Sequence, residues 1–160
     1  MAIITINTIE ELQLIGNDSA YPLSGDYELG NDIDASNTVG WNAGAGFDPI
    51  GDRWFNEEDD LILEDFTGTF DGKGFTIDGL FINRPDEDNI GLFGSTWDDP
   101  DNHVIIKNVN LTNCSITGQM YVGGLVGSVL NENNNTTITN CHVSGTISTR
   151  KNEWYIEGLE

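Results

Sequence analysis

The residues of this chain that could carry out bond-breaking chemistry are carboxylates. Asp71 and Asp78 lie close together in FDGKGFTID, with Lys73 between them. Paired carboxylates with a nearby base can cleave a polysaccharide by hydrolysis or elimination. The letters FDGKG are also typical of a turn, because Asp and Gly readily occupy turn positions. We favour the turn, and we predict that the chain has no catalytic residues.

Other acidic residues could bind a cation. Asp32 and Asp34 alternate in NDID, and Asp59 and Asp60 lie in the acidic stretch NEEDD. Carboxylates are the ligands that Ca²⁺ prefers, but the chain has neither an EF-hand loop nor the Gly-rich nonapeptide of calcium-binding β-rolls. A solvated acidic surface explains these residues more simply. We therefore expect no cofactor, and we keep Ca²⁺ as the alternative.

Three tryptophans lie in predicted connections rather than in predicted strands. They are Trp41, Trp54 and Trp97. An exposed indole ring stacks well on a sugar ring, whereas a buried one serves as a lid on a small core. These residues are the candidates for ligand binding, with the ligand itself unidentified.

The charge of the chain excludes several classes of partner. Its 160 residues include 27 acidic and 6 basic side chains, which gives a net charge of −21. Nucleic acid binding requires a basic surface, so we expect none. The sequence has no run of about 20 apolar residues, so we expect no insertion into a membrane.

The elements that must position these residues come from an internal repeat. IGLFG at 90–94 returns as VGGLVG at 122–127, and YIEGL at 155–159 echoes the second copy. Gly91 and Gly94 align with Gly124 and Gly127 at a spacing of 33 residues. A recurring glycine marks a place where the chain bends tightly or where two backbones come close.

A second pattern predicts columns of apolar side chains. IKNVNL at 106–111 returns as ITNCHV at 138–143, and IDGLFI at 77–82 resembles both. Asn108, Asn140 and Gly79 interrupt these runs at the same place, which predicts a corner with left-handed backbone. The predicted columns are Ile77, Ile106 and Ile138; Leu80, Val109 and Cys141; and Ile82, Leu111 and Val143.

A repeat of about 30 residues without a helix predicts a parallel β-solenoid, in which one repeat forms one coil. We assign residues 66–160 to the solenoid and residues 1–65 to a cap and first irregular strands, all in one continuous domain. Thr8 and Glu11 predict a capping box and a short helix, which would cover the first coil. We interpret residues 52–65 as an acidic loop, and we expect the chain to be a segment of a longer protein.

The order of these motifs resembles a known family. FTGTFDGKGFTIDGLFIN, IGLFG, IKNVNLTNCSITG, YVGGLVG and ITNCHVSGTIS follow one another as in the GLUG-motif repeats of bacterial and archaeal surface proteins. The resemblance covers about residues 27–159, and Glu157 departs from it. It implies a right-handed β-helix in a large secreted or cell-wall adhesin. The family's motifs are structural, so no catalytic residue carries over.

These observations predict a noncatalytic structural or adhesive β-solenoid module that is extracellular or on the cell surface. Its loops would contact a host protein, a cell-surface protein or a glycan. The alternative is a carbohydrate-active β-helix enzyme, a polysaccharide lyase or hydrolase, or a fragment of one. Strands at 138–159 without a cap would also allow end-to-end association of two chains.

Overall fold

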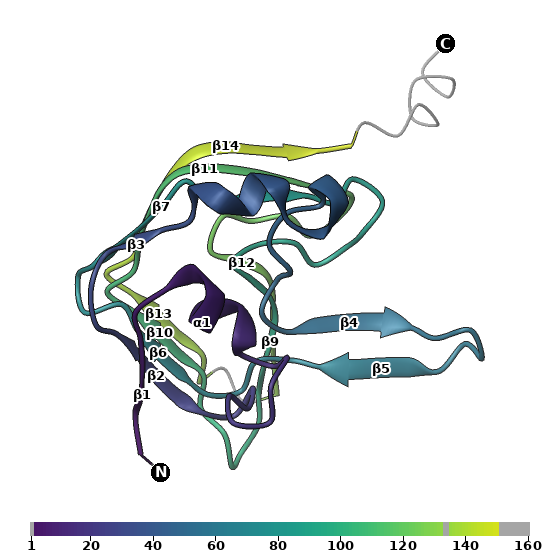
Figure 1. Cartoon of the computed structure of the whole chain (residues 1–160). Coiled ribbons are helices and arrows are strands. Elements are labelled where there is room, and N and C mark those ends of the chain that lie inside the picture. Colours follow the sequence, from purple (N-terminus) through teal and green to yellow (C-terminus); the bar gives the residue numbers. More distant parts are fainter. Residues whose placement is uncertain (1, 133–134, 151–160) are drawn as a thin grey trace.

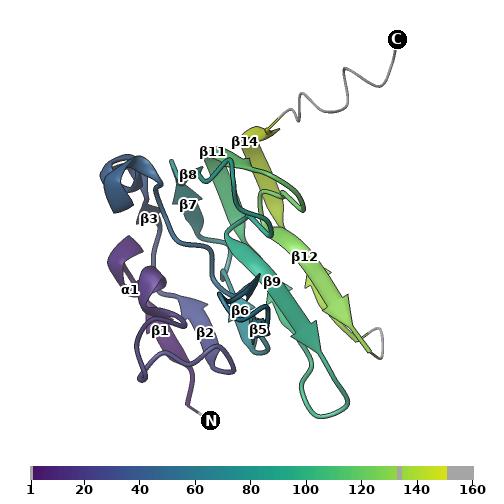
Figure 2. The ribbon, with the colours of Figure 1, turned by 90° about the vertical axis from the view of Figure 1, so that its right-hand side faces the viewer.

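The computed structural model describes residues 2–132 and 135–150, which form parallel strands stacked along one axis. Figure 1 looks down this stack, and Figure 2 shows it from the side. One sheet has the order β1 (Ile4–Ile6), β2 (Asp26–Leu29), β6 (Thr69–Asp71), β10 (Ile105–Lys107), β13 (Thr137–Thr139). A second has the order β14 (His142–Thr149), β11 (Asn110–Gly118), β7 (Thr76–Asp78), β3 (Ile33–Asp34), and β8 (Phe81–Asn83) also pairs with β11. A third contains β9 (Phe93–Asp98) and β12 (Val126–Asn131). This arrangement is mostly β, with stacked parallel strands, and is consistent with the predicted β-solenoid.

The glycine phrase repeats where the sequence predicts. Phe93 pairs with Val126 in parallel, and the amides of Leu92 and Phe93 donate to the carbonyls of the next copy. A Cβ on Gly127 would lie 2.7 Å from the carbonyl oxygen of Gly94. The glycines are therefore needed because successive coils approach closely at this place. Gly158 and Leu159 of the third copy lie outside the described residues.

The register of the apolar columns corrects one part of the sequence alignment. Ile106 pairs with Ile138 as predicted, but below Ile106 lies Phe70, and Ile77 pairs with Leu111. The placement of Ile77 in the column of Ile106 was wrong. The connection between β6 and β7 spans 72–75, whereas the one between β10 and β11 spans 108–109. Because the first connection is longer, β7 begins later after β6 than β11 does after β10, and the pairing register between the two coils shifts.

The same shift moves the other predicted neighbours of Ile77. Ile82 pairs with Ile116 instead of Leu111. Leu80 lies beside the strand segment that follows Leu111, since its carbonyl accepts from the amide of Ser115. The apolar residues among them, Ile77, Leu80, Ile82, Leu111 and Ile116, are all buried in the same core, so the shift changes their partners and not their burial.

The predicted asparagine corners are confirmed. Asn108 and Asn140 adopt φ values of 56° and 52°. The amide of Asn140 donates to the side-chain oxygen of Asn108, and Asn108 donates in turn to Asp71. This ladder of polar side chains fixes one edge of the stack. Gly79 also has positive φ, but it belongs to a different corner.

The predicted helix is confirmed as α1 (Ile9–Leu14). The Thr8 hydroxyl accepts from the amide of Glu11, and the Glu11 carboxylate accepts from the amide of Asn7. Its buried residues, Ile9 and Leu12, pack on the core at the β1 end of the stack (Figure 2). Two short 3₁₀ helices, Ser36–Gly40 and Asn42–Gly44, follow β3. No helix within the described residues is long and apolar enough to cross a membrane.

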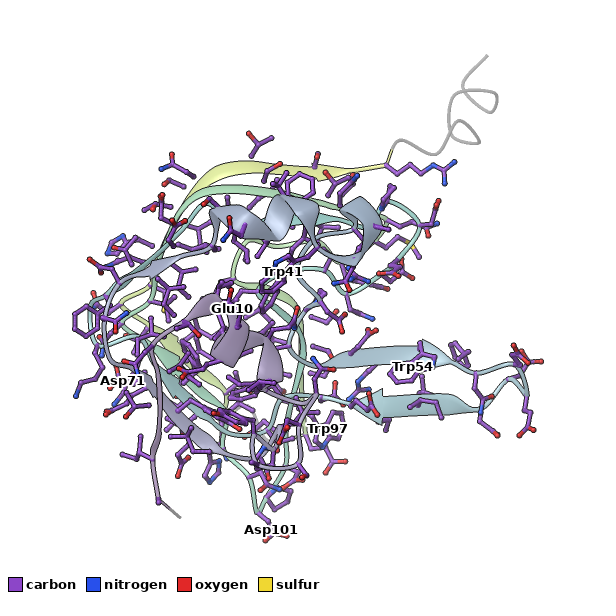
Figure 3. The ribbon with its side chains drawn as sticks, viewed as in Figure 1. Glu10, Trp41, Trp54, Asp71, Trp97 and Asp101 are labelled. Atoms are coloured by element: carbon purple, nitrogen blue, oxygen red, sulfur yellow. The ribbon has the colours of Figure 1, made fainter. Side chains whose placement is uncertain are left out.

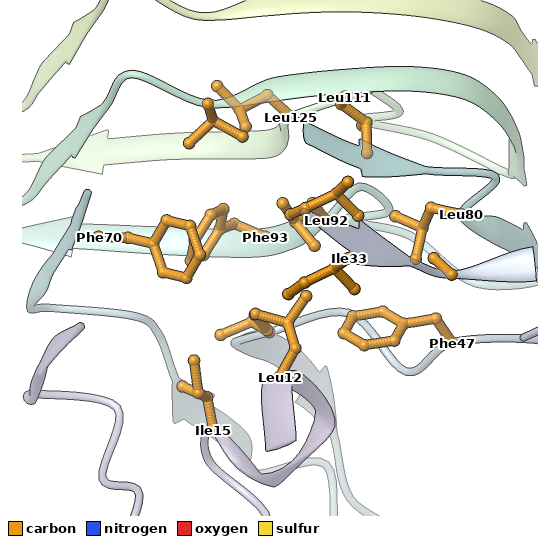
Figure 4. Close-up of a cluster of buried hydrophobic side chains, with 14 of the residues drawn as sticks. Leu12, Ile15, Ile33, Phe47, Phe70, Leu80, Leu92, Phe93, Leu111 and Leu125 are labelled. Atoms are coloured by element: carbon orange, nitrogen blue, oxygen red, sulfur yellow. The ribbon is translucent and has the colours of Figure 1, made fainter. Parts of the chain in front are cut away.

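One core runs the length of the stack (Figure 4). Side chains from α1, from the coils and from the glycine phrase contact one another in it. The predicted column residues buried there are Ile77, Leu80, Ile82, Ile106, Val109 and Leu111. Ile138 and Val143 are partly exposed, because β13 and β14 are the outermost strands of their sheets. Cys114 and Cys141 are free thiols, of which Cys114 is buried and Cys141 is half-buried.

Stacking begins before the repeat can be recognised in the sequence. Tyr27 pairs with Phe70, and Ile33 pairs with Ile77, so β2 and β3 extend the same two sheets. Residues in the segment 1–65 thus already form a coil. The sequence hides it because its connections differ in length and composition from those of the later coils.

Residues 52–65 form a hairpin, not the acidic loop that we expected. β4 (Asp52–Phe55) and β5 (Leu61–Glu64) pair antiparallel and project away from the stack (Figure 1). The Asn56 side-chain oxygen accepts from the amides of Glu58 and Asp60 and closes the turn. The chain leaves the stack after Ile50, which bridges to Phe93, and returns at Phe66, which bridges to Thr96.

A candidate binding groove beside the hairpin

The carboxylates that first suggested catalysis serve as turn anchors. Asp71 accepts from the amide of Lys73 and from the side chain of Asn108. Asp78 accepts from Thr112 and Asn113 at 2.6 and 2.7 Å. Burial raises the pKa of Asp71, but its hydrogen bonds and nearby lysines lower it overall, and hydrogen bonds lower the pKa of Asp78. Both groups act as acceptors for neighbouring coils.

The four calcium candidates lie in two separate places. Asp32 accepts from the amide of Thr76, and Asp34 accepts from the amide of Ser36. Asp59 and Asp60 lie at the tip of the hairpin, on the other side of the molecule (Figure 1). In residues 2–132 and 135–150, no group of three or more His, Cys, Asp or Glu side chains has an arrangement that could hold a metal ion.

Two of the three tryptophans line neighbouring hollows at the end of the stack that carries α1. Trp41 stacks on Phe47 with ring centroids 6.5 Å apart and lines a hollow of about 360 Å³. Trp54, on the hairpin, is 41% exposed and lines a hollow of about 290 Å³. Both hollows include Asn17 and Asp48. We call the two together the Trp groove.

Trp97 does not belong to this groove. It lies on β9 at the base of the hairpin, with the Arg53 guanidinium 4.8 Å from its ring centroid (Figure 3). Arg53 and Trp54 are neighbours in β4, so their side chains point to opposite faces of the hairpin. The structure thus brings Trp41 and Trp54 to one groove and leaves Trp97 on the other face.

The floor of the Trp groove is held by an amide pair. The Gln13 side chain donates to the carbonyl of Asp48 and accepts from its amide, at 2.9 and 2.8 Å. This pair fixes α1 to the segment that precedes the hairpin. Arg84 lies 3.8 Å from the Asp48 carboxylate and 3.1 Å from that of Glu87.

The Trp groove is electronegative. Its acidic lining residues are Glu10, Asp48, Asp52, Glu64 and Glu87, and Arg84 is the one cation that the described part of the chain contributes to its lining. Burial raises the pKa of Asp52 to about 6, and the neighbouring carboxylates add to this shift. Burial also raises the pKa of Asp48, although Arg84 opposes it. The groove can accept hydrogen bonds from hydroxyl or ammonium groups, and its two tryptophans can stack on flat apolar faces.

The raised pKa of Asp52 predicts a pH-dependent stability difference. Between its ordinary value of 3.8 and about 6, the folded chain holds a proton that the unfolded chain releases. This group therefore stabilises the fold less as pH rises through that window. The variant Asp52→Asn keeps an oxygen that can accept from the amide of Arg53. We expect the melting temperature of this variant minus that of the parent to increase from pH 4 to pH 6. A difference that stays constant or falls in a melting series would contradict this prediction.

Sequence reasoning missed most of the groove. Arg84 is far from Asp48 and Asp52 in the sequence, and no local pattern indicates that the three side chains line one groove. One signal was readable: DRWF and LILE are two short runs of strand-forming residues on either side of NEEDD, which is a hairpin pattern. Recognising it would have placed Trp54 on a strand.

Comparisons with known proteins give one family match and two similar proteins. Residues 118–148, which include β12, β13 and all but the last residue of β14, match the family described as the GLUG motif. Halomucin of Haloquadratum walsbyi is 39% identical over 145 residues, which cover 89% of this chain and 1% of halomucin. A protein of Evansella cellulosilytica named as a Gly-rich membrane protein is 33% identical over 105 residues, 64% of this chain and 10% of that protein. No solved structure matches the chain significantly.

Proposed function

We propose that this chain, which carries a GLUG motif, is a noncatalytic, right-handed β-solenoid module of a secreted or cell-surface protein, and that its Trp groove binds a glycan. The single observation that carries the proposal is the pairing of Trp41 and Trp54 in hollows joined by Asn17 and Asp48. The small share of each relative that the chain spans supports a role as a module within a longer protein.

The chemistry of the Trp groove favours a particular class of sugar. Indole rings at two places can stack on two sugar units, and the carboxylates between them can accept from hydroxyl groups. A uronic or sialic acid would meet five carboxylates and one arginine, which is unfavourable. The ligand class is therefore a neutral or amino-sugar oligosaccharide.

A binding assay with neutral, amino and acidic oligosaccharides tests this function. We expect binding to the first two classes only, and at least tenfold weaker binding in Trp54→Ala and Trp41→Ala. Phe55→Ala is the matched control, because it removes an exposed aromatic from the opposite face of the same strand. Failure of all three sugar classes to bind would overturn the proposal.

One observation favours a second function, a carbohydrate-active enzyme. A carboxyl group with a pKa of about 6 in a cleft with other carboxylates is suited to act as a general acid. Incubation with the same oligosaccharides, followed by measurement of new reducing ends, separates the two functions. Cleavage that is lost in Asp52→Asn would replace the noncatalytic proposal.

We also propose that two chains can associate through the outermost strands β13 and β14. Ile138, Val143 and Ile147 are partly exposed there, and edge strands offer unpaired backbone groups. The charge of −21 on each copy opposes contact, so association should increase as salt screens it. We expect dimers at high protein concentration in molar salt by sedimentation, and fewer for Val143→Asp. A strict monomer under these conditions would contradict the proposal.

A further inference from the structure

The face of the hairpin opposite to Trp54 is apolar and exposed. Arg53 pairs with Leu63 and Phe55 pairs with Leu61, so all four side chains share this face. Phe55, Leu61 and Leu63 are 69%, 48% and 56% exposed. We call these four residues the apolar hairpin face.

The apolar hairpin face continues into a hollow at its base. This hollow has a volume of about 300 Å³, and Leu23, Leu63 and Trp97 supply its apolar lining. Arg53 covers one side of the Trp97 ring and is paired with Asp65 at 2.6 Å. The face thus offers apolar side chains on the hairpin and an aromatic side chain at its foot.

The surroundings of this face are acidic. Glu57, Glu58, Asp59 and Asp60 form the tip of the hairpin, and Glu64 lies at its base. Arg53, the cation of this face, is already neutralised by Asp65. A ligand here therefore meets apolar contacts bordered by negative charge.

The apolar side chains and their acidic surroundings together indicate which kind of partner would bind the apolar hairpin face. The apolar side chains lie on a projecting two-stranded element and add nothing to the main core. A second copy of the chain would bring the same acidic tip and a charge of −21, so it is not the complementary partner. A segment that carries apolar side chains flanked by Lys or Arg satisfies both the apolar contacts and the charge.

We propose that the apolar hairpin face binds a cationic, apolar segment of another protein. The proposal rests on the proposed role of the chain as a noncatalytic module of a secreted or cell-surface protein, but it uses the opposite face of the hairpin from the Trp groove. The hairpin would then contact two different ligands on its two sides.

The experiment uses the whole chain and three soluble peptides of equal length. One alternates Lys and Leu, one alternates Lys and Ser, and one alternates Glu and Leu. We expect the Lys-Leu peptide to bind at least tenfold more tightly than either of the others in fluorescence anisotropy. Binding of the Lys-Ser peptide with equal affinity would overturn the proposal, since attraction to acidic groups alone would then explain it.

Variants locate the interaction. Leu61→Ser with Leu63→Ser should weaken binding of the Lys-Leu peptide at least tenfold, and replacement of the four acidic tip residues by their amides should lower its salt dependence. Both changes affect exposed side chains, and circular dichroism verifies that the fold is kept. Trp54→Ala is the matched control and should bind the peptide unchanged. Unaltered binding by the double variant would place the peptide elsewhere and refute the proposal.

The same variants separate this proposal from glycan binding. Peptide binding that depends on Leu61 and Leu63 without any sugar binding would sustain this inference and remove the glycan function. Sugar binding that depends on Trp54 without peptide binding would do the reverse. A dimer that the double variant abolishes would identify a second copy as the occupant and overturn the choice of partner.

Discussion

Leu111→Asp abolishes cooperative folding: this is the largest effect that we expect from a single substitution. Leu111 is fully buried and lies between Ile77 and Val143 in one column of the core. A carboxylate there would lose its hydration without gaining a partner, at a cost of about 4 kcal/mol or more. Domains of this kind have a free energy of unfolding of about 5–15 kcal/mol, so the variant would be largely unfolded. Far-ultraviolet circular dichroism during chemical denaturation measures it.

Val143→Asp is the matched control, because it places the same charge in the same column. Val143 is 41% exposed on the outermost strand, where water can still reach the carboxylate. We expect this variant to stay folded, with a smaller loss of stability. Equal damage at both positions, or a stable Leu111→Asp variant, would show that the column is not arranged as described.

Gly94→Ala should strongly destabilise the fold, although it adds only one methyl group to the glycine phrase. A Cβ at this position would lie 2.3 Å from the carbonyl oxygen of Gly51 and 2.6 Å from that of Asn89. Both neighbours are backbone, so the clash cannot be relieved by turning a side chain. We expect a loss of about 3 kcal/mol in the free energy of unfolding, measured by urea denaturation.

Gly40→Ala serves as the comparison for this substitution. No atom lies within 4 Å of the Cβ that it would add, and Gly40 does not have a positive φ. We expect its stability to change by less than about 0.5 kcal/mol. If the two alanine variants were equally stable, close approach of the coils could not explain the recurrence of the glycine phrase.

Much of the fold was readable from the sequence because the later coils repeat with constant length. The spacing between Gly94 and Gly127 equals the register seen between β9 and β12. The corners at Asn108 and Asn140 were readable because few residues other than glycine tolerate left-handed backbone. The helix was readable from its capping box at Thr8 and Glu11.

The register of Ile77 was not readable, because the longer corner after β6 precedes a strand whose letters fit two positions. Similar letters do not determine register when connections change length, since pairing is decided by where each strand starts. The coil formed by β2 and β3 was hidden for the same reason.

The candidate site was harder to predict than the fold. Trp41 and Trp54 could be proposed from residue type alone, but their hollows depend on Asp48, which the Gln13 side chain holds in place. A contact between residues 35 positions apart leaves no local pattern in the sequence. The apolar hairpin face was missed because its acidic tip made the whole segment look like a solvated loop.

The hairpin leaves and rejoins the stack at nearly the same level, since Ile50 and Phe66 both bridge to β9, opposite Phe93 and Thr96. Its length therefore does not alter the rise of about 4.8 Å from one rung to the next. In a rod built from such coils, the projecting hairpins would lie at axial separations that are multiples of this rise. A hairpin could be lengthened or exchanged without changing the axial spacing between neighbouring hairpins.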